Sequence, residues 1–121
     1  MRTRDLRPGF FRSTDLKGLP YETRILFAGL WCMADLRGRL LDEPALIKAD
    51  VLPFDKVAVD KHLSLLAERG LIDRYEADGH RCIWITKFHQ HQHPHPNEPE
   101  SMLPCGVVEQ RANKNGAMVT Q

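Results

Sequence analysis

Apolar residues recur at helical spacing between residues 20 and 35. Pro20 suits the first helical position, and Glu22 favours the positive N-terminal end of a helix. The repeating positions are Leu26, Leu30 and Met33, and Ile25, Phe27, Ala28, Trp31 and Ala34 lie beside them. Because these residues cover most of the circumference, the pattern predicts a central helix that is buried on several sides.

A second, shorter helix is expected after a brief extended segment. Gly38 ends the first helical unit, and residues 39–41 form the extended segment. Asp42 is a good N-cap for the second helix, whose first turn tolerates Pro44. Pro53 cannot continue a helix, so the second helix is predicted to be short.

A third helix is predicted to stop at Gly70, because glycine readily adopts the left-handed conformation found at helix ends. Its apolar face consists of Val59, Leu63, Leu66 and Ala67. The start of this helix is open. Asp55 as the N-cap leaves only a tight turn after the second helix, whereas Asp60 as the N-cap makes the connection a longer loop.

A β-hairpin is the clearest local feature of the chain. Asp78 and Gly79 form a type I′ turn pair between two strand-like segments, residues 71–77 and 80–86. This turn sets Glu76 opposite Arg81, Tyr75 opposite Cys82, Arg74 opposite Ile83, Asp73 opposite Trp84 and Ile72 opposite Ile85. Opposite charges then meet near the tip, and the isoleucines share the face that packs on a core.

The predicted order of elements is helix, short strand, helix, helix and hairpin. This order is typical of the winged helix-turn-helix, an α+β fold, and the alternative is a generic helical domain with a hairpin. We expect an N-terminal arm over residues 1–19, a winged-helix domain over residues 20–88, and a His- and Pro-rich disordered tail over residues 89–121. Trp84 and Tyr75, on the outer face of the hairpin, would support a homodimer.

Composition narrows the classes of partner. The chain of 121 residues has 17 Lys and Arg against 16 Asp and Glu, so DNA binding has to come from a local patch rather than from overall charge. Residues 1–24 do carry an excess of positive charge. These basic residues either contact phosphates or are simply solvated, and the sequence leaves both alternatives open. The cysteines lack paired spacing, and neither a membrane span nor a secretion signal is visible, so we expect a cytoplasmic protein.

Several strings in this order resemble a known family. They are RPGFF, LFAGLWCMADLRGRL, IKAD, LPFD, LLAERGLIDRYEADG and FHQHQHPHPNEPES. Over residues 6 to about 103 they resemble the N-terminal winged-helix domain of bacteriophage and prophage replication proteins, the replisome-organiser or replication-initiation type. The resemblance implies DNA binding in phage replication, within the cytoplasm of a bacterial host cell. Relatives often help to load the replicative helicase through a further C-terminal segment, but only a short stretch follows Pro104 here, so contact with the helicase or its loader stays open.

In a winged helix the third helix enters the major groove, and side chains near its N-terminal end reach base edges. The candidates in this sequence are Lys56, Lys61, His62 and Ser64. The lysines could bind guanine or phosphate, and Ser64 could bind phosphate. His62 could bind either one if its side chain projects outward. The alternative is that these are ordinary solvated positions, since Asp55 and Asp60 close by would repel phosphate.

The hairpin offers a second set of candidate DNA contacts. His80 and Arg81 lie at its tip, and Arg74 and Lys87 lie nearer its base, a combination suited to the minor groove or the DNA backbone. Arg81 has an alternative role as an exposed cross-strand partner of Glu76. The remaining candidates, which would clamp flanking phosphates from the second and first helices, are Lys48 and Arg24.

Histidines alternate with Gln and Pro after the hairpin. Imidazole is a favoured ligand of zinc, copper and nickel, and the residues concerned are His89, His91, His93 and His95. An extended strip does not hold four side chains in a tetrahedron, so we expect a surface tail with no bound metal and no cofactor. A nuclease site would need His89, His95 and Glu98 to fold against the domain. No other enzyme motif is present, and we expect a protein that is not an enzyme.

The leading hypothesis is sequence- or structure-preferring binding of double-stranded DNA, with a helix over residues 55–69 as the reader and the hairpin as the wing. Two alternatives stay open. The near-neutral charge favours a winged-helix module that docks a replication or host protein. A phage transcriptional regulator would share the fold and differ in its target.

Overall fold

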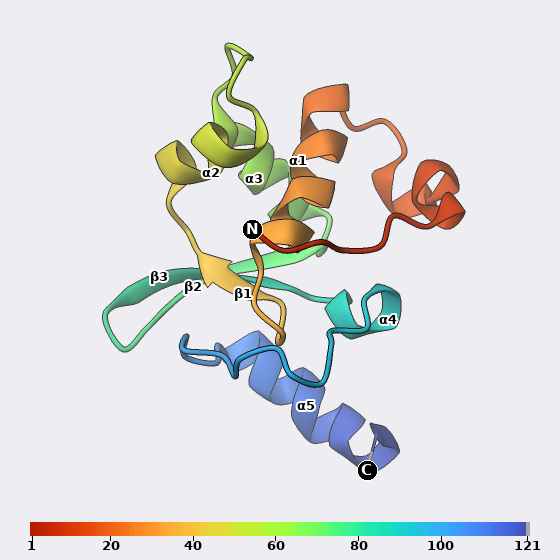
Figure 1. The fold of residues 1–121 in the computed structure, drawn as a ribbon, viewed down its shortest axis with the longest axis vertical. Helices are drawn as coiled ribbons and strands as arrows, with labels where there is room; N and C mark the ends of the chain where they lie inside the picture. Colours follow the sequence, from red (N-terminus) through yellow and green to blue (C-terminus); the bar gives the residue numbers. More distant parts are fainter. Residues whose placement is uncertain (121) are drawn as a thin grey trace.

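The chain folds into a helical layer, a three-stranded antiparallel sheet and a C-terminal layer beneath the sheet (Figure 1). The computed structural model describes residues 1–120, and side chains as far as residue 114. The elements are η1 (Pro8–Arg12), η2 (Thr14–Leu16), α1 (Tyr21–Met33), β1 (Arg39–Leu41), α2 (Pro44–Val51), α3 (Val59–Glu68), β2 (Ile72–Ala77), β3 (His80–Ile85), α4 (Phe88–His91) and α5 (Val107–Thr120), where η1 and η2 are 3-10 helices. The predicted α+β class is confirmed.

α1 is the central helix of the upper layer, with α2 and α3 packed against it (Figure 1). Leu26 and Leu30 are fully buried, as the apolar pattern predicted. Pro20 is the N-cap residue of α1 rather than its first helical residue. A Cβ atom at Gly29 would lie 2.3 Å from Cγ1 of Val51. Glycine is therefore required where α1 and α2 approach each other, because any larger side chain would push the two helices apart.

The second and third helices are present, but their predicted N-caps are wrong. Glu43 precedes α2, and Asp42, which was expected to cap it, is buried beside the sheet. α3 begins at Val59 after a loop over residues 52–58, so the longer of the two connections is the one formed. Gly70, with a φ of 72°, ends the helix as predicted, and its N–H donates to the carbonyl oxygen of Ala67 over 3.0 Å.

The hairpin forms in the predicted register. All five predicted cross-strand pairs are present, from Glu76 opposite Arg81 to Ile72 opposite Ile85. Asp78 and Gly79 have φ values of 51° and 77°, as a type I′ turn requires. β1 adds to the free side of β3, which gives the strand order β1-β3-β2.

One face of the sheet packs on the helices. Strand alternation places on this face Leu40, Ile72, Ile83 and Ile85, all of which are buried in the core. Leu63 and Leu66 of α3 belong to the same core, so the helix is attached to the sheet by its apolar side. The opposite face carries Arg39, Tyr75, Cys82 and Trp84, because these residues alternate with the core positions.

The C-terminal segment covers this opposite face, which contradicts the prediction of a disordered tail over the described part of residues 89–121. The hydroxyl of Tyr75 donates to the carbonyl oxygen of Pro104 over 2.6 Å. Arg39 pairs with Glu109 at the start of α5, with Nη2 and Oε2 2.7 Å apart. Trp84 and Tyr75 are therefore not an open face for a homodimer. The predicted tail also includes Gln121, which lies outside the described residues.

The N-terminal arm is docked as well. Leu16 and Leu19 are buried in the core, although the predicted domain began only at residue 20. Arg4 donates to the carbonyl oxygens of Trp31 and Ala34 at the end of α1, over 3.1 and 2.9 Å. Its guanidinium is thus used inside the protein rather than left free for phosphate. Within residues 1–120, no helix combines the length and the apolar character that crossing a membrane requires.

Candidate nucleic-acid interface

Two of the predicted DNA-contacting lysines are exposed at the N-terminal end of α3. Lys61 is the third residue of the helix, and Lys56 lies in the loop before it. Val59 and Leu63 point into the core, which turns Lys61 toward solvent. Neither lysine has an ion-pair partner among the residues with described side chains. Both ammonium groups are free to meet a phosphate or a base edge.

His62 does not belong to this surface, so its prediction as a DNA contact is wrong. The residue is buried between α1 and α3, and its Nδ1 lies 2.6 Å from the hydroxyl oxygen of Thr23, which is also buried. Position 62 follows Val59 by three residues and precedes Leu66 by four. It therefore lies on the apolar face of the helix. The helical spacing alone could have assigned His62 to the interior.

We expect His62→Ala to lower the free energy of unfolding by roughly 2–4 kcal/mol. The substitution removes packed volume and leaves the buried hydroxyl of Thr23 without its partner. Urea unfolding followed by circular dichroism measures the change. Lys61→Ala, at the exposed neighbouring position, is the control and should change stability by less than about 0.5 kcal/mol. Equal, small losses in both variants would contradict the buried placement of His62.

Arg74 and Ser64 were also predicted to contact DNA, and the structure uses both in an internal network. Nε and Nη2 of Arg74 donate to the carboxylate of Asp42, over 2.7 and 3.0 Å. Nη2 also reaches Oδ1 of Asp60 at 2.7 Å, and Nη1 donates to the hydroxyl of Ser64 over 3.2 Å. The buried carboxylate of Asp42 requires a charged partner, and Arg74 supplies it. Arg74 therefore joins the hairpin to the start of α3 instead of pointing at DNA.

The same network changes the charge around α3. The hydrogen bond from Arg74 lowers the pKa of Asp60, and the hydrogen bond to Asp42 raises the pKa of Arg74. Arg74 is thus paired with both carboxylates at once. Because Asp60 shares a cation with Asp42, its repulsion of a nearby phosphate is reduced. No short-range pattern in the sequence indicated this contact, since Asp42 and Arg74 are 32 positions apart.

The hairpin tip presents the other free cation of the predicted set. His80 and Arg81 are both exposed. Arg81 lies opposite Glu76 in the sheet, yet the predicted ion pair between them is not formed among the described side chains. The tip also carries Asp78. The surface made by α3 and the hairpin is therefore mixed in charge, and its free cations are Lys56, Lys61 and Arg81.

The three remaining candidates lie elsewhere. Nζ of Lys48 donates to the carbonyl oxygen of Leu52 over 3.3 Å, so it closes the end of its own helix. Lys87 lies beyond the far end of β3 from the hairpin tip, with Nζ 3.5 Å from Oδ2 of Asp15. Arg24 rests on the ring of Tyr21, with Cζ 4.7 Å from the ring centroid. Arg24 has no carboxylate partner among the described side chains.

The histidine strip does not assemble a metal or nuclease centre within the part of the chain that has described side chains. No three ligating residues come together there. Of the trio that a nuclease would need, Glu98 is held by Arg4, with Oε1 and Nη1 2.8 Å apart, and Nδ1 of His95 accepts from the N–H of Asn97. Arg4 lowers the pKa of Glu98 through this hydrogen bond. Glu98 therefore joins the C-terminal segment to Arg4 of the N-terminal segment, and His95 makes a local contact within its own turn.

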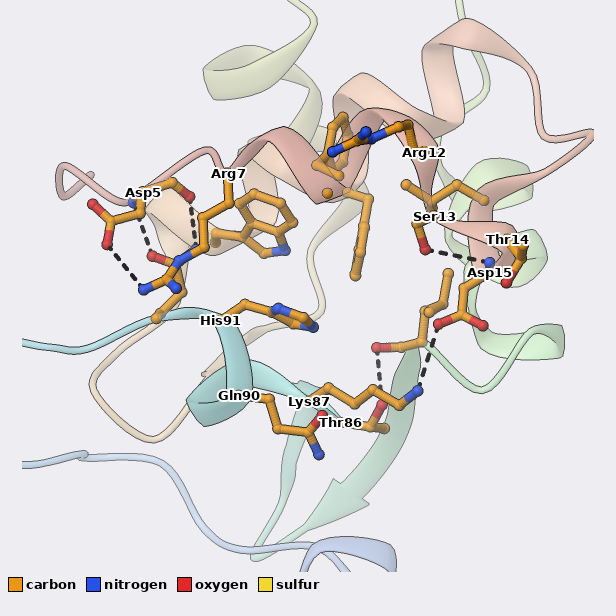
Figure 2. Close-up of a pocket in the computed structure, with 17 residues that line it drawn as sticks. Asp5, Arg7, Arg12, Ser13, Thr14, Asp15, Thr86, Lys87, Gln90 and His91 are labelled. Atoms are coloured by element: carbon orange, nitrogen blue, oxygen red, sulfur yellow. Dashed lines mark hydrogen bonds and ion pairs between the residues drawn. The ribbon is translucent and has the colours of Figure 1, made fainter.

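A hollow of about 620 Å³ lies between the N-terminal segment, α1 and α4 (Figure 2). Its apolar wall includes Phe10, Phe27 and Trp31. Figure 2 shows the ring of His91 pointing into it from α4. Its charged rim is largely paired internally, as in the contact between Lys87 and Asp15. The hollow could accept an apolar group, but it has little uncommitted charge with which to select a ligand.

Comparison with known proteins adds no family to this description: no family model, no curated protein and no solved structure matches the chain. The features of this molecule that bear on function are its exposed cations, their surroundings and the arrangement of the elements that carry them.

Proposed function

We propose that this chain is a DNA-binding protein with a winged helix-turn-helix fold, in which α3 enters the major groove and the β2–β3 hairpin is the wing. The observation that supports this most strongly is the exposure of Lys61 on α3, within the order helix, strand, helix, helix, hairpin and a β1-β3-β2 sheet. In helix-turn-helix proteins, residues near the N-terminal end of this helix contact base edges. Lys61 occupies such a position.

Each free cation has a distinct task in the proposed complex. Lys61 reaches guanine or phosphate in the major groove, and Lys56 contacts the backbone beside it. Arg81 and His80 contact the backbone or the minor groove from the tip of the wing. Arg74 is a positioning residue, because its contacts with Asp60 and Ser64 hold the hairpin against the start of α3.

The process that we propose is the initiation or organisation of phage DNA replication in the cytoplasm of a bacterial host. This part of the proposal is supported by the resemblance of residues 6 to about 103 to phage replication proteins. The replicative helicase or its loader is the corresponding protein partner. Transcriptional regulation is the alternative with the same mode of DNA binding.

A second candidate function is docking of a replication or host protein. It is favoured by Phe54, which is 97% exposed on the loop between α2 and α3, and by the exposed side chain of Leu46 on α2. Exposed large apolar side chains are typical anchors of protein interfaces. The near-neutral charge of the chain agrees with this alternative as well.

A salt titration separates the two functions. If Lys56, Lys61 and Arg81 each contact one phosphate, the logarithm of the DNA affinity should fall with the logarithm of salt concentration with a slope of about −2.7. A roughly threefold rise in salt then weakens binding about 20-fold. Fluorescence anisotropy of a labelled random duplex measures this slope. An affinity that hardly responds to salt, or no binding to duplex DNA at low salt, would favour the docking function instead.

A further inference from the structure

A second surface of the protein combines basic and aromatic side chains. It is a groove of about 800 Å³ between the N-terminal segment and α1. Figure 1 shows these segments on the other side of the molecule from the hairpin tip. The side chains that give the groove its chemistry are Phe11, Arg12, Lys17, Tyr21 and Arg24. Among the residues with described side chains, neither Asp nor Glu lines the groove.

The cations of this groove are uncommitted. Arg12, Lys17 and Arg24 form no ion pair with any described carboxylate. Nε of Arg24 is buried without a hydrogen-bond partner, so the protein does not use the donors of this guanidinium fully. The nearest acidic residues in sequence are Asp15, which is held by Lys87, and Glu22. The groove therefore attracts anions, in contrast to the mixed surface of α3 and the hairpin.

The aromatic side chains of the groove are exposed and held in place. Tyr21 and Phe11 are 73% and 69% exposed. The guanidinium of Arg24 covers one face of the Tyr21 ring, at 4.7 Å from its centroid. Phe11 packs edge-on against Phe10, with ring centroids 5.3 Å apart, and Phe10 packs in the same way against Trp31. Two aromatic rings are thus presented to solvent on supports that belong to the folded domain.

We propose that this groove binds a single strand of nucleic acid, with bases stacked on Tyr21 and Phe11 and phosphates paired with Arg12, Lys17 and Arg24. Proteins that bind single strands combine a positive groove with aromatic platforms in this way, because every base has a face that stacks and every linkage carries a negative charge. In a duplex the bases are stacked on one another, so no base face is available to stack on Tyr21 or Phe11. The site selects unpaired strands and is distinct from the duplex-binding surface at α3.

The test uses the full chain and fluorescence anisotropy of a labelled oligothymidylate. Tyr21→Ala and Phe11→Ala should each weaken binding by roughly tenfold or more, because each removes one stacking platform. Tyr21→Phe keeps the ring and should bind like the unchanged protein. Phe54→Ala is the control, since it removes an aromatic ring that is even more exposed but lies outside the groove. Circular dichroism verifies that each variant is folded.

Two results would overturn the proposal. One is the absence of oligothymidylate binding by the unchanged protein at low salt. The other is an equal loss in Tyr21→Ala and Phe54→Ala, which would mean that exposed aromatic residues act without regard to place. Charge reversal at Lys17, with Lys17→Glu, should weaken binding and make the dependence on salt shallower by about 0.7 for the lost phosphate contact.

Two further measurements define the ligand and keep the two sites apart. An oligouridylate of the same length identifies RNA as the source if it binds more tightly than oligothymidylate, and DNA if it binds less tightly. Either result supports the groove. Lys61→Glu should leave oligothymidylate binding unchanged, whereas Tyr21→Ala should leave duplex binding unchanged. If Lys61→Glu abolished both activities, the groove would not be a separate site.

Discussion

Lys61→Glu is expected to abolish duplex DNA binding while the domain stays folded. Loss of one base or phosphate contact weakens binding by roughly 1–3 kcal/mol, and a carboxylate at the same place adds repulsion of the DNA backbone. We therefore expect a loss of about 100-fold or more. Lys61 is exposed and its ammonium group has no ion-pair partner among the described side chains, so the unfolding transition should not move. Anisotropy of a labelled duplex and thermal unfolding measure the two quantities.

The matched control for this variant is Lys114→Glu. Lys114 is an exposed residue of α5, beneath the sheet, so the substitution makes the same change in net charge away from α3. It should reduce duplex affinity only slightly. Unchanged affinity in Lys61→Glu would discredit the assignment of α3 as the reading helix. An equal loss in both variants would mean that total charge, rather than this position, governs binding.

Arg39→Met should lower the free energy of unfolding by roughly 3–5 kcal/mol, because it leaves the carboxylate of Glu109 buried without its partner. The two side chains are only 13% and 4% exposed. Arg39 donates to both carboxylate oxygens of Glu109, from Nε over 2.9 and 3.1 Å and from Nη2 over 2.7 Å. Nη1 also donates to the carbonyl oxygen of Leu103, over 2.9 Å. Calorimetry or denaturant unfolding measures the loss.

An exposed pair on the same side of the sheet provides the comparison. Arg37 and Glu100 are 3.0 Å apart but both are exposed, so Arg37→Met should lower stability by less than about 1 kcal/mol. The double variant Arg39→Met with Glu109→Leu should recover much of the loss, because it removes the unpaired buried charge. If Arg39→Met and Arg37→Met had the same small effect, the C-terminal segment would contribute little to the stability of the domain.

Much of the fold follows from short-range features of the sequence. The apolar spacing around Leu26 and Leu30 predicted α1, and Gly70 was correctly identified as the end of α3. The Asp78-Gly79 turn determined the register of the whole hairpin, since side-chain alternation leaves no freedom once the turn is known. These features depend on a few consecutive residues and their intrinsic preferences. These elements could be predicted without knowing the tertiary contacts between them.

The candidate site was predicted only in part, because local periodicity indicates exposure but not contacts between residues far apart in the sequence. Exposure of Lys61 and of the hairpin tip follows from the same periodicities. The periodicity also places His62 inside, whereas the prediction of a DNA contact required this side chain to project outward. A buried imidazole is acceptable here because Thr23, on another helix, completes its hydrogen bonding. The sequence shows both residues without showing that they meet.

The sequence by itself determined α1, α2, α3, the hairpin and the position of the exposed lysines, because local spacing and turn chemistry decide these. Only the tertiary structure decided which charges are free. Arg74 is bound to Asp42 and Asp60, whereas Arg12, Lys17 and Arg24 line one groove with aromatic rings. It also placed the C-terminal segment on the sheet, through the pair of Arg39 and Glu109, which are 70 positions apart. Ion pairs and burial depend on distances between segments remote in sequence, and folding alone brings these together.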